Sequence, residues 1–110
     1  MSDGERIQTF EEFWPFYLGE HRHPVNRALH FAGTSLAIMT AASSVFLGPQ
    51  QVALALVAGY GPAWVGHFFV EKNKPASFKH PLWSFRADFK MYAMMWQRKL
   101  GDELALHGIG

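Results

Sequence analysis

The sequence predicts an all-α protein, a four-helix membrane bundle built on a central hairpin of two apolar helices. The first observation is that positions 28–70 contain no Lys, Arg, Asp or Glu. The second is Gly48-Pro49, which divides this stretch into two arms of about 20 residues, each long enough to span a bilayer as a helix. The third is that 49% of all residues are hydrophobic and only 17% are charged. We expect a single helical domain over residues 1–110, because this length suits one hydrophobic core.

At the N-terminus we expect a loose leader over residues 1–8, followed by a short aromatic helix. Thr9 and Glu12 have the spacing of a capping box, in which the hydroxyl and the carboxylate each bind a free backbone N–H. The aromatic residues that follow suit a membrane interface or a lid over the core. Pro15 lies beyond the first helical turn, so we expect it to kink or divide this helix. Pro24 then suits the first position of the next helix.

The two arms of the hairpin are expected to be helical over residues 24–47 and 51–71. Small residues recur every four positions on the first arm and form a ridge that lets another helix approach closely. This ridge consists of Gly33, Ala37 and Ala41. In the second arm we expect an interruption at residues 59–62, because Pro62 leaves a backbone carbonyl without its helical partner.

A last helix is expected to begin at Pro81 or Ser84, after a loop that ends near His80. Its aromatic residues recur at helical spacing, which indicates an amphipathic helix. They are Phe85, Phe89, Tyr92 and Trp96. Asp88 lies on the same apolar side, so its carboxylate needs a partner, either a cation or a metal-bound histidine. We expect the tail over residues 101–110 to be ragged.

Charge indicates location and partners. The net charge of +1 gives no reason to expect nucleic-acid binding. The basic residues that flank the hairpin all lie at its open end, so the positive-inside rule places both termini of an integral membrane protein in the cytoplasm. These residues are Arg22, Arg27, Lys72, Lys74 and Lys79. A soluble bundle, especially a homo-oligomer, would also hide such a hairpin. We favour the membrane because so long an uncharged stretch is hard to bury in a small soluble domain.

Histidines gather at the open end of the hairpin. His30 and His67 each lie roughly 26 Å from the tip at about 1.5 Å per residue, so antiparallel arms place them at similar depth. His21 and His80 flank that end in the sequence. The chain has no Cys, so a metal would be bound by His, carboxylate or water. Such donors suit Fe(II), Mn(II) or Zn(II), and open coordination positions suit an oxygen-activating non-haem iron.

Three pairs at a spacing of four residues can present a histidine together with a group that orients it. These pairs are Tyr17 with His21, Asn26 with His30, and His67 with Glu71.

Together the motifs resemble the family of fungal 2-hydroxy fatty acid dioxygenases and their bacterial relatives, formerly a domain of unknown function. The resemblance covers the chain from about Tyr17 to Asp88, and the combined motif is far more specific than any single piece. Its parts are Tyr17-x-x-x-His21, Pro24-x-Asn26-Arg27-x-x-His30-x-x-Gly33, Gly66-His67-x-x-x-Glu71-x-Asn73-Lys74-Pro75-Ala76, His80-Pro81, Ser84 and Asp88.

The resemblance implies an integral membrane, Fe(II)-dependent dioxygenase of fatty acid α-oxidation, which uses dioxygen to shorten a lipid-like 2-hydroxy fatty acid by one carbon. The implied iron ligands are His21, His30, His67 and His80. Glu71 and Asp88 are the expected catalytic carboxylates, which ligate the metal or orient its histidines. Four further residues are expected at the substrate, with a cation of Arg27 or Lys74 pairing with its carboxylate. These four are Arg27, Lys74, Tyr17 and Asn26.

Two other hypotheses remain open at this point. In one, His30 and His67 are the two axial ligands of a haem across the hairpin. In the other, the protein is a non-enzymatic membrane hairpin whose histidines only pack and form hydrogen bonds.

Overall fold

The computed structural model describes residues 7–109, and every regular element among them is helical, as predicted. The major helices are α2 (Phe10–Gly19), α3 (Pro24–Ala42), α5 (Gln50–Val65), α6 (Pro81–Trp96) and α7 (Leu100–Leu106). Three short segments complete the fold: α4 (Ser44–Leu47), the π-helical η1 (Gly66–Glu71) and the 3₁₀-helical η2 (Ala76–Phe78). The expected leader falls largely outside the described residues, although Ile7 packs against the core.

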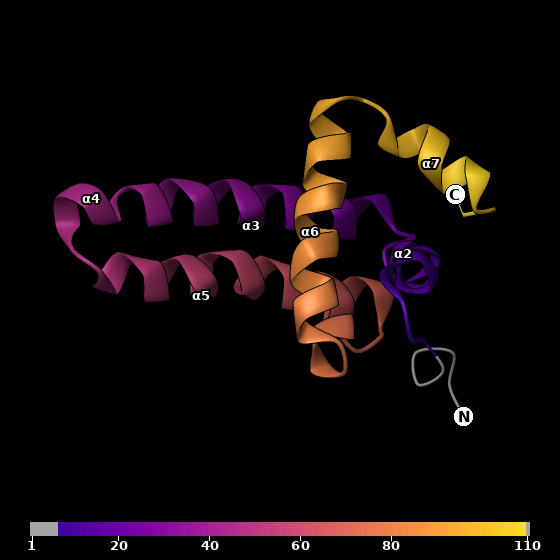
Figure 1. Ribbon diagram of the computed structural model, residues 1–110, viewed down its shortest axis with the longest axis horizontal. Helices are drawn as coiled ribbons and strands as arrows, with labels where there is room; N and C mark the ends of the chain where they lie inside the picture. The colour runs from indigo at the N-terminus through magenta and orange to yellow at the C-terminus, as the bar shows by residue number, and fades with distance from the viewer. Residues whose placement is uncertain (1–6, 110) are drawn as a thin grey trace.

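The predicted hairpin is present, with α3 and α5 antiparallel and side by side (Figure 1). Gly48 reverses the chain at the tip with a φ of 104°, a conformation that a side chain would strain. The two helices approach each other closely at Gly33. A Cβ atom added to this residue would lie only 2.8 Å from the carbonyl oxygen of Gly59. A Cβ atom at Gly59 would in turn lie 3.3 Å from that of Ala37. This contact confirms the role of the small-residue ridge at Gly33 and Ala37.

The hairpin projects from the rest of the molecule (Figure 1). Many of its apolar side chains are exposed. At the tip, Phe46 is 90% exposed, and Val57 on α5 is 69% exposed. The segments Pro24–Leu47 and Gln50–Glu71 are both long and apolar enough to cross a membrane. Exposed apolar surface of this kind is typical of a region that contacts a membrane or another protein.

The buried apolar cluster lies beside the open end of the hairpin, where α2, α6 and α7 pack together. Aromatic residues of α2 dominate it, with Phe13, Trp14 and Tyr17 all nearly inaccessible to solvent. Among the described residues, this cluster includes none from the hairpin. The two helices of the hairpin bury few side chains, because they contact each other through small residues.

The expected ragged tail is a helix, which adds α7 to the four helices predicted. Leu100, Leu104 and Ile109 are buried in the core. The indole Nε1 of Trp14 donates a hydrogen bond of 2.9 Å to the carboxylate of Glu103. This short helix has too few apolar residues to show a helical period in the sequence. It is stabilised by packing against segments that are distant in the sequence.

Neither proline divides its helix. α2 begins as predicted, with the Thr9 hydroxyl accepting a hydrogen bond from the backbone N–H of Glu12. It then continues through Pro15 to Gly19, and the carbonyl that loses its partner belongs to exposed Glu11. Likewise α5 runs through Pro62, so the interruption expected at residues 59–62 is not found. The departure from α-helical geometry comes later, at η1.

Candidate metal site

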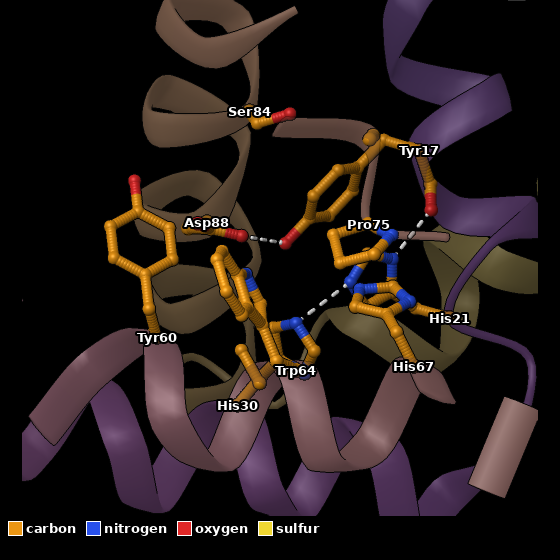
Figure 2. Close-up of a pocket in the computed structure, with 11 residues that line it drawn as sticks. Tyr17, His21, His30, Tyr60, Trp64, His67, Pro75, Ser84 and Asp88 are labelled. Carbon is orange, nitrogen blue, oxygen red and sulfur yellow. Dashed lines mark hydrogen bonds between the residues drawn. The ribbon is translucent and has the colours of Figure 1, made fainter. Parts of the chain in front are cut away.

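Three histidines from separate elements converge at the open end of the hairpin (Figure 2). His21 lies in the turn after α2, His30 in α3 and His67 in η1. Their side chains are 1%, 5% and 3% exposed. One possible ligand nitrogen from each ring lies within 4.8 Å of the others. The hairpin therefore brings His30 and His67 together as predicted, and α2 adds His21 to them.

The Nδ1 atom of each ring is bound to a carbonyl oxygen. His21 donates to the backbone carbonyl of Tyr17 at 2.6 Å, and His30 to that of Asn26 at 2.9 Å. His67 donates to the side-chain carbonyl of Asn73 at 2.7 Å. Because a carbonyl only accepts, each Nδ1 carries the proton and each Nε2 keeps a free lone pair.

These free lone pairs point toward a common space. The Nε2 atoms of His21 and His30 lie 3.0 Å apart, and neither has a hydrogen to donate. Burial, together with the neighbouring His30 and His67, lowers the pKa of His21 well below its ordinary value, so this ring stays neutral. Two nitrogens that bind one ion at about 2.1 Å in adjacent positions lie about 3 Å apart. The residues present therefore fit a metal ion that prefers imidazole.

The π-helical geometry of η1 explains how His67 reaches Asn73. A π-turn closes at five residues, and Lys72 then reverses the chain in the left-handed conformation with a φ of 58°. The Asn73 amide also donates to the backbone carbonyl of Glu20 and to its carboxylate, at 3.2 and 3.0 Å. Sequence reasoning assigned no role to Asn73 or Glu20, since their spacing to His67 matches no regular helix.

Glu71 forms its hydrogen bonds with the start of α3. Its carboxylate accepts hydrogen bonds from the backbone N–H of His23 at 2.7 Å and from the amide of Asn26 at 3.2 Å. It thus joins the end of the second arm to the start of α3, at the helix N-terminus that a carboxylate favours. The predicted common face of His67 and Glu71 depended on α-helical spacing, which η1 does not have.

The partner of Asp88 is the hydroxyl of Tyr17, not the cation or histidine that we expected. Tyr17 is buried, and its ring stacks on His21 at 4.1 Å between centroids. Burial raises the pKa of Asp88 to about 6, and the hydrogen bond from Tyr17 opposes this increase. Tyr17 and Asp88 therefore form a polar wall beside His21 (Figure 2).

The structure does not bring His80 to the other three histidines. Its ring stacks on that of Trp83, with 5.2 Å between the centroids. It also makes an edge contact with the ring of Phe13, with 5.4 Å between the centroids. His80 lies between η2 and α6, at the N-cap of α6.

The remaining predicted residues have different surroundings. Arg27 donates from one guanidinium nitrogen to the carbonyls of His21 and Arg22, at 2.8 and 2.7 Å, so it stabilises the turn that carries His21. Asn26 is fully buried, and its side-chain oxygen has no hydrogen-bond partner among residues 7–109. Lys74 is exposed and lines a separate cavity of about 230 Å³.

The space beside the three histidines is small, about 10 Å³, which is enough for a single ion or water. A porphyrin does not fit between His30 and His67, because the ring of His21 occupies this place. Its centroid lies 4.4 Å from the ring centroid of His30 and 4.5 Å from that of His67. This arrangement disfavours the haem hypothesis. It favours a compact site for a single metal ion bound by the three histidines.

Comparison with known proteins agrees with this geometry. A search of curated proteins and a search of solved structures found no match. A family model described as 2-hydroxy-palmitic acid dioxygenase Mpo1-like matches residues 7–100, which include all three histidines and Asn73. This chain belongs to the Mpo1-like family.

Proposed function

We propose that this protein is an Fe(II)-dependent dioxygenase that converts a 2-hydroxy fatty acid to the acid one carbon shorter. The observation that carries the proposal is the trio of buried histidines with free Nε2 lone pairs facing one another. The description of the family supports the substrate class and the reaction. With dioxygen, a 2-hydroxy acid balances as the shortened acid, carbon dioxide and water.

His21, His30 and His67 are the residues that would hold the metal. A non-haem iron(II) ion bound by few protein ligands supplies the chemistry that activates dioxygen and leaves positions for a chelating substrate. The protein holds the three rings in one tautomer through their Nδ1 hydrogen bonds. Asn73 serves His67 as a positioning residue, and Tyr17 with Asp88 forms the wall beside His21.

The substrate carboxylate requires a cation near the site. Lys74 is our candidate, because its cavity and the space beside the histidines share Pro75 and Ala76 in their linings. Arg27 has a second role in our proposal, since its hydrogen bonds to backbone carbonyls fix the position of His21. Glu71 would act similarly through the start of α3.

We propose an integral membrane location, with both termini on the cytoplasmic side. The two apolar arms and their exposed side chains support insertion of the hairpin. The basic residues of the open end support the orientation. The metal site would then lie near the membrane surface. A fatty acid has its polar head group at this surface and its acyl chain in the membrane.

The test is the metal content and product of the purified protein in detergent. After anaerobic loading we expect about one iron per chain and conversion of 2-hydroxypalmitate to the acid with one carbon fewer. His67→Ala should lose both. His107→Ala is the matched control, since His107 lies at the end of α7, and it should retain both. Full activity of metal-free protein would refute the proposal. An absence of metal in every preparation would favour the structural hairpin.

A further inference from the structure

A groove bounded by α3, α5 and α6 lies next to the three histidines. Its volume is about 60 Å³. Small residues of the hairpin, Ala37 and Gly59 among them, line one side. Leu56, Phe85 and Phe89 line the others, and these three side chains are between 40% and 52% exposed. The groove is therefore lined mainly by apolar groups, with Thr34, Tyr60 and Asp88 as its polar residues, and it opens to the surroundings of the hairpin.

The groove leads to the metal site. Tyr60 and Asp88 line both the groove and the small space beside the histidines. Figure 2 shows Tyr60 and Asp88 together on the side away from His21 and His67. These two shared residues therefore place the groove beside the space at the histidines.

We propose that this groove binds the acyl chain of the substrate, with the chelating head group at His21, His30 and His67. The inference rests on the proposed function. The groove holds the methylenes nearest the head group, since its volume is too small for a long chain. The rest of the chain runs over the apolar surface of the hairpin, where exposed side chains such as Val52 and Leu54 lie.

The other neighbouring cavity is lined by three charged side chains, whereas the groove is lined by one. It is larger, about 230 Å³, and Phe16 and Phe78 contribute apolar surface to it. However, Glu20, Lys74 and Lys79 also line it. Burying methylenes against such groups displaces their water without replacing its hydrogen bonds. This cavity suits the polar end of a ligand, and the groove suits the apolar end.

The test is photocrosslinking with a 2-hydroxy fatty acid that carries a diazirine on its acyl chain. The protein is labelled in detergent micelles, with excess unlabelled 2-hydroxypalmitate as competitor, and the sites are located by mass spectrometry. We expect competed labels on α5 near Leu56 and on α6 near Phe85 and Phe89. Labels confined to Phe16 or Phe78, or the absence of competed labels on the groove, would overturn the inference.

Two adjacent substitutions sharpen the test. Leu56→Trp should fill the groove and reduce competed labelling, and kcat/KM for the long acid, by about tenfold. Its metal content should remain that of the wild type. Val57→Trp adds the same ring to an exposed neighbour that does not line the groove, and it should change neither quantity. Equal effects of the two would overturn the inference.

The readouts separate this inference from the proposed function. Labelling of the wild-type protein requires no turnover and no mutant. Labels in the groove without conversion of any 2-hydroxy acid would support the acyl site and refute the reaction. Conversion of 2-hydroxypalmitate without labels in the groove would support the reaction and refute the acyl site.

Discussion

The Nε2 atoms of His21 and His30 face each other at 3.0 Å, although the Nδ1 atom of each ring already donates its proton to a backbone carbonyl. Two lone pairs at this distance repel each other unless a positive charge lies near both. Protonation of His21 is disfavoured by its burial. A metal ion satisfies both nitrogens and the third one from His67, so metal binding should affect stability as well as activity.

Metal removal should lower the thermal stability of the protein. An ion at 100 times its dissociation constant stabilises the fold by about 2.7 kcal/mol, which corresponds to a rise in Tm of several degrees. Addition of Fe(II) under nitrogen to chelator-treated protein should show this rise by intrinsic tryptophan fluorescence. His21→Ala should abolish the rise, and His107→Ala should preserve it. The same rise in both variants would mean that the ion binds elsewhere.

Asn73→Ala should weaken metal binding by about 10- to 100-fold, because His67 loses the acceptor that fixes its tautomer and orientation. Titration of the apo protein with metal measures this affinity. Gln97→Ala, an exposed position at the end of α6, is the control and should bind metal as the wild type does. Unchanged affinity in Asn73→Ala would show that packing alone holds His67 in place.

Gly66→Ala should destabilise the protein and disturb the site. A Cβ atom there would lie 1.9 Å from the side-chain oxygen of buried Asn26, so either this side chain or one of the two helices must shift. Gly101→Ala in α7 is the control, because a Cβ atom at Gly101 would meet no atom of another segment within 4 Å. It should be neutral or stabilising by up to about 1 kcal/mol, from the better helix propensity of Ala. Equal Tm values for the two variants would contradict the close contact of Gly66 with Asn26.

Asp88→Asn should raise stability at neutral pH and remove a pH dependence. The unfolded chain releases this proton near pH 3.9, whereas in the folded protein burial raises the pKa of Asp88 to about 6. Between these values the folded state binds more protons, so the stability of the wild type falls as pH rises. The free energy of unfolding of the variant should equal that of the wild type below pH 4 and exceed it by roughly 3 kcal/mol at pH 7.

Chelator-treated wild type and Asp88→Asn, compared by thermal unfolding from pH 4 to 7, measure this difference. The hydroxyl of Tyr17 can still donate to the amide oxygen of the variant. Parallel curves for the two proteins would show that the Asp88 carboxylate is not buried in the folded state.

Leu104→Ala should destabilise the protein by about 2 to 5 kcal/mol, since it removes a buried side chain from the core beside α2 and α6. Leu106→Ala makes the same chemical change two residues away, where the side chain is 75% exposed, and it should have little effect. Chemical denaturation of both variants gives the comparison. A small effect of Leu104→Ala would indicate that α7 is not docked.

The elements of the fold were largely predictable because their signals are local. The absence of charge, the Gly48-Pro49 turn and the helical spacing of apolar residues all act within one segment. They suffice to predict the hairpin, and the hairpin alone brings His30 to His67. The family resemblance rested on the same residues, and the family match over residues 7–100 confirms it.

Other features depend on contacts between segments far apart in the sequence, so only the tertiary structure decided them. His21 joins the candidate metal site because α2 packs against α6, whereas the ring of His80 stacks on Trp83. Asn73 replaces Glu71 beside His67 because η1 adopts a π-helical turn. Asp88 pairs with Tyr17, and α7 docks onto the core, through contacts that no local period reveals.

Sequence by itself determined the helices, the apolar hairpin and the residue types available for a metal, because backbone propensity and side-chain chemistry belong to each segment. Tertiary structure decided which nitrogens share one space, which groups orient them and which cavities adjoin them. The physical reason is that ligand geometry depends on the relative placement of four separate segments, α2, α3, η1 and α6. That placement is a property of their packing and not of any one segment.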